Sequence, residues 1–222
     1  MLFSFHNDQN SVIADNILDI LISDEKLLNL AQESGIDCRK VNSLLRQIKE
    51  YHPEVFQHSL NVARLSALLS RKLKLSAIEI YIISIGALLH DLGKIFLPRS
   101  ILDKKGKLTP DEYMLVKSHP QIGANMVFTL DSREQLKPIL LLHHERLDKK
   151  GYYAISKYNI PLSTRIITLA DAFDAMTSPR PYQKQKNLSE CWMEIEKCSG
   201  TQFDPELLPD FYSVVKDINN VR

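Results

Sequence analysis

Apolar residues recur at three- and four-residue intervals through most of this chain, and this spacing restricts it to helical folds. The pattern runs from Ser11 to about Ala31 and again from Pro53 to Leu73. No stretch of strand length alternates apolar and polar residues, and we find neither a repeat nor a low-complexity linker. The sequence therefore predicts an all-α fold, with a helical extension at residues 1–50 and one helical-bundle domain at residues 51–222.

Composition and charge exclude several classes of protein. A formal net charge of +1 on 222 residues lacks the overall basic field of a non-specific nucleic-acid binder, so we expect no DNA or RNA partner. The three cysteines are widely separated, which is typical of free thiols in a reducing compartment. The N-terminus has no basic region or cleavage site, and the apolar runs are too short to span a membrane. We expect a cytoplasmic protein without membrane insertion, and the sequence indicates no oligomeric state.

The stretch Ala87–Ile95 ends an apolar run in three unlike polar groups, His90, Asp91 and Lys94. An imidazole followed at once by a carboxylate offers a nitrogen and an oxygen ligand to a divalent metal. A helix end with a solvated His-Asp pair, and with Lys94 near the negative end of the helix dipole, explains the same residues. The dipeptide alone does not decide between these interpretations.

Five of the seven histidines stand beside apolar runs, in predicted helices or at their ends. They are His58, His90, His119, His143 and His144, and acidic residues Glu54, Asp91 and Asp171 accompany them. A hydrogen-bonded core His-Asp pair explains any one of these histidines, but burying so many unpaired groups is costly. A cluster of divalent metal ions satisfies all of them together. The set contains no cysteine, which argues against structural zinc, and its donors suit iron, manganese, zinc or nickel.

The order and spacing of these motifs resemble a known enzyme family. The motifs are His58-Ser59-Leu60-Asn61-Val62-Ala63, Ala87–Ile95, Lys107-Leu108-Thr109, Lys117–Gly123, His143–Tyr152, Ile160-Pro161-Leu162, Leu169–Ser178, Arg180-Pro181-Tyr182 and Phe203-Asp204-Pro205. From about Glu54 to Phe211 the chain is similar to the HD-GYP subgroup of HD-domain phosphohydrolases, which are bacterial cyclic di-GMP phosphodiesterases. The resemblance implies metal-dependent hydrolysis of cyclic di-GMP to linear pGpG in second-messenger signalling, and it leaves open a further step to GMP.

The resemblance also implies roles for individual residues. Two or three divalent ions, iron or manganese before zinc or nickel, would be held by His58, His90, Asp91, His119, His143, His144 and Asp171, with Glu54 at the position that allows a third ion. Three residues would take part in catalysis, namely Asp91, Lys94 as a phosphate contact, and Asp174 as the group that accepts or orients a proton. By the same resemblance Lys94 and Arg180 would bind the nucleotide. Lys184 would add local positive charge for nucleotide binding, although a solvated surface lysine explains Lys184 equally, since the family often has a basic residue where this chain has Gln183.

The chain departs from the family pattern in the loop that gives the family its name. The family has Gly-Tyr-Pro, whereas this chain has Gly151-Tyr152-Tyr153, preceded by Lys149 where the family usually has glycine. The segment 154–159 is about one residue short and lacks the family's glycine-rich turn. Because proline fixes φ and glycine permits positive φ, we expect this loop to be differently shaped or more mobile.

Two alternatives to the phosphodiesterase follow from the altered loop. The first is a weakly active or inactive module that keeps the metals and senses a nucleotide or binds a partner such as a diguanylate cyclase. The second is a hydrolase of another cyclic dinucleotide. The intact set of predicted ligands favours an enzyme over the sensing module.

Overall fold

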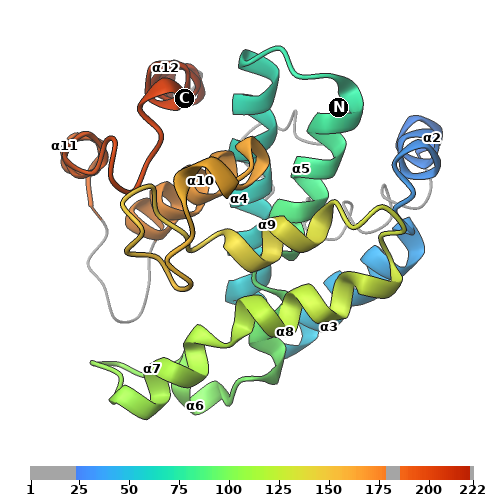
Figure 1. Ribbon diagram of the computed structural model, residues 1–222, viewed down its shortest axis with the longest axis horizontal. Coiled ribbons are helices and arrows are strands. Elements are labelled where there is room, and N and C mark those ends of the chain that lie inside the picture. Colours follow the sequence, from blue (N-terminus) through green and yellow to red (C-terminus); the bar gives the residue numbers. More distant parts are fainter. Residues whose placement is uncertain (1–23, 179–185, 221–222) are drawn as a thin grey trace.

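The computed structural model describes residues 24–178 and 186–220, and every regular element in these residues is a helix (Figure 1). The longer helices are α2 (Glu25–Ser34), α3 (Cys38–Tyr51), α4 (Pro53–Lys72), α5 (Ala77–Leu89), α7 (Pro110–Lys117), α8 (His119–Met126), α9 (Leu136–Leu142), α10 (Leu162–Thr177), α11 (Leu188–Lys197) and α12 (Leu208–Asn220). Shorter elements are η1 (Leu92–Phe96), α6 (Arg99–Leu102), η2 (Val127–Thr129), η3 (Lys157–Asn159) and η4 (Pro205–Leu207). The predicted all-α fold is confirmed. None of the helices in these two ranges is both long and apolar enough to cross a membrane.

Helices α4 and α5 run side by side and form the centre of the bundle (Figure 1). Helix α10 packs across α4, while α9 packs against α5 and α8 packs against α9 and η1. Helix α5 is apolar on all sides, and its residues Tyr81 and Ile83 to Leu89 are buried. A helix of this kind is stable only inside a protein, which explains its central place.

Capping boxes start three of the helices at the positions that the sequence marks for them. The side chains of Ser76, Thr109 and Asn187 accept hydrogen bonds from the backbone N–H three residues later, and the glutamate at that later position returns the bond. Each box satisfies donors that the first turn of a helix would leave unpaired. The start of α5 is therefore fixed locally, and its length then places His90 at its C-terminal end.

Helix α3 contributes directly to the same core as the central pair. Its residues Val41, Leu45 and Ile48 are fully buried, and α3 packs against α4, α5 and η1. The predicted boundary near residue 50 falls at the junction of α3 and α4, where the core continues without a break. The division into an extension and a domain stays a prediction, and residues 1–23 of that extension lie outside the described part of the chain.

Candidate metal centre

His90 and Asp91 reach the centre of the molecule because α5 ends there and the chain turns into η1. Both side chains are buried, with exposed fractions of 0% and 1%. Gly93 makes the turn possible, since a Cβ atom at this position would lie 2.0 Å from the backbone oxygen of His119. The missing side chain lets η1 pack directly on α8, and this contact brings Asp91 to His119.

Three buried histidines share one arrangement. In His90, His119 and His143 the Nδ1 atom lies within hydrogen-bond distance of the carbonyl oxygen three residues earlier. The acceptors are the oxygens of Ala87, Val116 and Leu140, at 2.7, 2.6 and 2.8 Å, respectively. A carbonyl oxygen can only accept, so each Nδ1 carries the proton and each Nε2 of a neutral ring offers a lone pair. This is the state in which a histidine binds a metal through Nε2.

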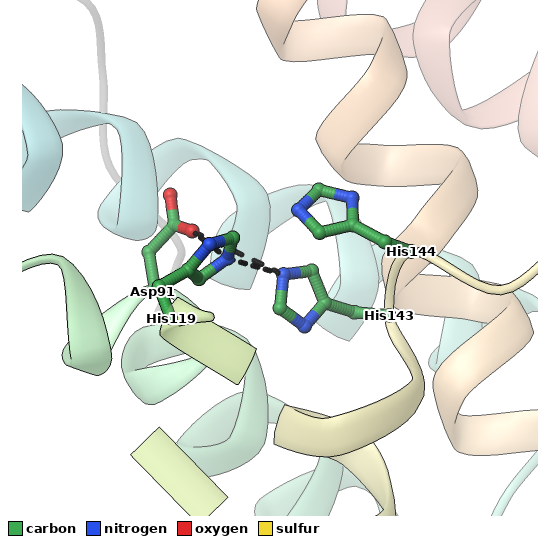
Figure 2. A group of neighbouring side chains, drawn as sticks. All are labelled: Asp91, His119, His143 and His144. Atoms are coloured by element: carbon green, nitrogen blue, oxygen red, sulfur yellow. Dashed lines mark hydrogen bonds and ion pairs between the residues drawn. The ribbon is translucent and has the colours of Figure 1, made fainter. Parts of the chain in front are cut away.

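These Nε2 atoms converge on the carboxylate of Asp91. Figure 2 shows the ring of His119 between Asp91 and His143, with His144 beside His143. Oδ1 of Asp91 lies 3.2 Å from Nε2 of His119 and 3.9 Å from Nε2 of His143. Oδ2 lies 3.4 Å from Nε2 of His90 and 3.8 Å from Nε2 of His58.

Asp91 therefore belongs to two groups of potential ligands. One group contains Asp91, His119, His143 and His144, and the other contains His58, His90 and Asp91. Within each group the ligand atoms lie within 4.8 Å of one another. A carboxylate with one oxygen facing each group is suited to bridge two cations.

Protein partners leave several of these atoms unsatisfied. Nε2 of His90 and Oδ1 of Asp91 are buried without a hydrogen-bond partner in the described residues. Nε2 of His119 and Nε2 of His143 lie 3.2 Å apart. Burial, together with neighbouring His144, holds the pKa of His143 well below its usual range, so its neutral ring directs the lone pair of Nε2 toward His119. Each such unsatisfied buried group costs about 1–3 kcal/mol, and a bound cation removes this cost.

The second group is organised around His58 on α4. Its Nε2 lies 3.0 Å from Oδ1 of Asp171, and its Nδ1 lies 2.6 Å from Oδ2 of Asp174. Asp171 and Asp174 are three residues apart on α10, so both reach the same face of α4. Burial alone would lower the pKa of His58, but the two carboxylates outweigh burial and raise it to about 9.

Asp174 acts here as a support for His58. Its carboxylate is buried, and besides His58 it accepts hydrogen bonds from Nδ2 of Asn61 at 2.9 Å and Oγ of Ser178 at 2.8 Å. With its oxygens occupied in this way, Asp174 fixes the direction of the imidazole. Its predicted part in proton transfer stays a prediction.

The remaining predicted site residues lie around this cluster. Nζ of Lys94 lies 2.5 Å from Oδ2 of Asp91. Burial would raise the pKa of Asp91, but the charge of Lys94 and the histidines holds it well below its usual range. Glu54 is exposed in the first turn of α4, one helical turn before His58, and belongs to neither group. Arg180 and Lys184 lie outside the described residues.

Sequence reasoning missed the groups that hold the ligands in place. The three carbonyl oxygens behind His90, His119 and His143 are backbone atoms, and no side-chain pattern marks them. Glu145, which is 2% exposed, follows directly after His143 and His144, but its adjacency to two ligands gave no hint of its contacts. The buried donor set, all nitrogen and oxygen, fits divalent metal binding.

Comparison with known proteins agrees with this geometry. The HD domain family matches residues 42–207, which is most of the chain. The chain belongs to the HD-domain family. In this HD domain Asp91 belongs to both groups of potential ligands, and His90 belongs to one of them.

Relatives of this HD domain include named phosphodiesterases. A cyclic di-GMP phosphodiesterase of Thermotoga maritima is 38% identical over 191 residues, which cover 82% of this chain and 50% of the relative. A 3′3′-cGAMP-specific phosphodiesterase of Vibrio cholerae is 35% identical over 172 residues, covering 72% of this chain and 37% of the relative. This HD domain thus spans half or less of the length of these two relatives. The predicted kinship with the HD-GYP subgroup is confirmed.

The fold has a counterpart among solved structures. A HDG"Y"P protein from Bdellovibrio bacteriovorus aligns with a TM-score of 0.63 at 17% identity, over 97% of this chain and 75% of that one. At this level of identity the likeness is one of fold. It supports the helical-bundle architecture of the HD domain.

Proposed function

We propose that this chain is a metal-dependent phosphodiesterase that hydrolyses cyclic di-GMP to linear pGpG, with GMP as a further product. The observation that carries the proposal is the buried Asp91, which faces two groups of ligands. Many enzymes that cleave phosphodiesters by in-line displacement use two cations about 3.5–4 Å apart. The name of the Thermotoga maritima relative supports cyclic di-GMP as the substrate.

The proposed ligands divide between the two groups. His119, His143 and His144 would hold one ion and His58, His90 and Asp171 the other, with Asp91 shared. Glu54 would join only if a third ion binds, because it is exposed one turn away from His58. Iron or manganese suits this mixture of imidazole and carboxylate, and zinc and nickel are the alternatives.

The chain's own residues contribute positioning and charge. When bound, the divalent ions supply Lewis-acid activation of water and of the phosphoryl group. Lys94 lies beside Asp91 and is 20% exposed at its side chain, so it can reach a phosphate oxygen from the edge of the site. There its charge would offset negative charge that develops on the phosphoryl oxygens. Asp174 would keep His58 aimed at the centre, and Arg180 and Lys184 would add contacts to the nucleotide.

A second cyclic dinucleotide is a specific alternative substrate. The Vibrio cholerae relative that is 35% identical to this chain is named as specific for 3′3′-cGAMP. The two substrates differ in one base, while the phosphodiester chemistry at the cluster is the same. Base-recognising residues would therefore decide between them.

The test of the function is a product analysis. The protein is purified without oxygen, its metal content is measured, and cyclic di-GMP, 3′3′-cGAMP and bis(p-nitrophenyl) phosphate are offered in turn. We expect turnover of a cyclic dinucleotide. In Asp91→Asn the activity should fall by more than about 100-fold, because substituting a residue that only hydrogen-bonds to a metal ligand already lowers activity about 10- to 100-fold.

The matched control is Asp217→Asn, which removes the same charge from an exposed position of α12. It should keep full activity. A metal-loaded wild type that hydrolyses none of the three compounds would overturn the proposal, and nucleotide binding without hydrolysis would favour the sensing module.

We also propose that the protein acts in the cytoplasm. Cys38, Cys191 and Cys198 are free, which supports a place in the reducing cytoplasm. Binding to a diguanylate cyclase stays a prediction.

A further inference from the structure

His144 is held differently from the other histidines of the cluster. His90, His119 and His143 are each anchored through Nδ1 to a backbone carbonyl. No hydrogen bond joins the side chain of His144 to another residue in the described ranges. Its ring instead contacts His143 at 4.1 Å and Tyr152 at 4.6 Å between centroids. The direction of this imidazole therefore depends on the rings packed against it.

Tyr152 is presented to His144 by a loop that Glu145 holds. The carboxylate of Glu145 is buried, and each of its oxygens accepts one backbone hydrogen bond. Oε1 accepts from N–H of Tyr153 at 2.6 Å, and Oε2 accepts from N–H of Ile155 at 2.9 Å. Charge-assisted bonds of this length are among the stronger ones in proteins. They fix the backbone directly after Tyr152.

The loop needs such a restraint because its backbone is strained. Lys149 has φ of 62° and Ala154 has φ of 54°, a left-handed conformation that side chains other than glycine rarely adopt. Gly151 lies close to Glu145. A Cβ atom on Gly151 would be 2.6 Å from the Cα of Glu145 and 2.8 Å from Oε2 of Glu145. The hydrogen bonds to Glu145 lie at this strained part of the loop, at Tyr153 and Ile155, on either side of Ala154.

One of the two hydrogen bonds depends on the departure of this chain from its family pattern. Tyr153 stands where the resembling family has proline, and proline has no N–H to donate. The bond from Tyr153 to Oε1 is therefore available to this chain and not to a chain with Gly-Tyr-Pro. The tyrosine side chain itself is 40% exposed, so its backbone is the part that matters.

We propose that Glu145 is a positioning residue for the metal centre, acting on His144 through the backbone of the 149–155 loop and the ring of Tyr152. The inference rests on the proposed role of His144 as a metal ligand. It assigns Glu145 no contact with substrate or with reacting atoms.

Three variants test the proposal. Glu145→Gln keeps the shape of the side chain but turns an NH₂ group toward one of the two N–H donors, so one bond is lost. Tyr153→Pro removes the N–H that donates to Oε1; it also removes the exposed ring and fixes φ. The matched control Tyr153→Ala removes the exposed ring and keeps the N–H.

The measurements are amide hydrogen exchange and the affinity for Mn²⁺ after removal of metal with a chelator. In Glu145→Gln we expect faster exchange at Tyr153 and Ile155 and a dissociation constant for Mn²⁺ raised about 10-fold, the usual effect of disturbing a group behind a ligand. Tyr153→Pro should raise exchange at Ile155 and weaken Mn²⁺ binding by a smaller factor. Tyr153→Ala should match the wild type in both measurements.

Reciprocity gives a further check in the wild type. If the loop and the metal are coupled, Mn²⁺ must slow exchange at Tyr153 and Ile155, because a closed loop that strengthens Mn²⁺ binding is in turn stabilised by bound Mn²⁺. The amides of α11 serve as the internal reference. Unchanged Mn²⁺ affinity in both Glu145→Gln and Tyr153→Pro would overturn the proposal, as would loss of affinity in Tyr153→Ala.

These readouts separate the inference from the proposed function. Exchange rates and Mn²⁺ affinity need no substrate, so both can be measured if the protein hydrolyses nothing. If hydrolysis is found, saturating Mn²⁺ should restore kcat in Glu145→Gln, because the residue acts only on the metal centre. If Glu145→Gln fails to fold, the pair Tyr153→Pro and Tyr153→Ala carries the test alone.

Discussion

At His58 two carboxylates decide the charge of a single ring. Asp171 and Asp174 lie 3.0 and 2.6 Å from its two nitrogens and raise its pKa to about 9. In the metal-free protein His58 is therefore protonated at neutral pH. A metal ion that binds through Nε2 has to displace this proton.

The affinity for Mn²⁺ should therefore rise with pH and level off above about 9. In Asp174→Asn one source of the raised pKa is removed, so the curve should level off at a lower pH. The measurement is a Mn²⁺ titration between pH 6 and 10 in the wild type and the variant. Asp217→Asn should follow the wild-type curve, and identical curves for Asp174→Asn and wild type would contradict the role of Asp174.

The same pairing affects the stability of the metal-free protein. A histidine whose pKa is raised on folding stabilises the folded state fully below its unfolded pKa of 6.5, and the contribution is lost as pH rises through about 9.

At the scale of elements, helix ends supply most of the proposed ligands. His90 and His143 directly follow the last residues of α5 and α9, and His119 is the first residue of α8. At such ends a side chain can reach the carbonyl three residues earlier, which is how all three Nδ1 atoms are anchored. The lengths and starts of the helices thus control where the Nε2 atoms meet.

The cap of α5 should matter more than the equivalent cap of α7. Ser76→Ala removes the side-chain oxygen that accepts a hydrogen bond from the N–H of Glu79 in the first turn of α5. Because α5 is buried at the centre of the bundle, we expect a loss of about 1 kcal/mol in the free energy of unfolding. Thr109→Ala removes the same bond from α7, which buries none of its residues. Its effect on global unfolding should be smaller, because α7 can fray alone. Urea unfolding of the two metal-free variants compares them, and equal losses would contradict this ranking.

At the scale of the whole molecule, the bundle encloses an apolar core with a polar cluster inside it. The cluster includes His90, Asp91 and His143, all of them nearly fully buried. Nε2 of His90 and Oδ1 of Asp91, which lack a hydrogen-bond partner among the described residues, make the metal-free state costly, while the surrounding helices hold the proposed ligands close together. Metal binding should therefore stabilise the fold as a whole.

Metal removal should lower the melting temperature. At a free Mn²⁺ concentration of about 100 times the dissociation constant, binding to the folded state alone adds about 2.7 kcal/mol. For a chain of this size that corresponds to roughly 5–10 °C. Differential scanning calorimetry with Mn²⁺ and with EDTA measures the difference, which Asp91→Asn should largely abolish. An equal shift in Asp91→Asn would mean that the ion binds elsewhere.

The sequence alone determined the fold class and predicted which residues form the cluster. Helical periodicity predicted an all-α bundle, capping residues placed the starts of α5, α7 and α11, and histidines at the ends of apolar runs indicated a metal centre. These signals are local, because a helix start and an apolar face depend on residues within a few turns. The motif order added the HD-GYP kinship.

Only the tertiary structure decided how the ligands are shared and held. That Asp91 faces both groups, that Asp174 supports His58, and that Glu145 binds the backbone of the 149–155 loop all depend on contacts that form only in the folded chain. Gly93 illustrates the reason, since its missing side chain matters only because the backbone of α8 lies against it. The sequence predicted the ligands through local chemistry, whereas the directions of these side chains come from packing, which no local pattern encodes.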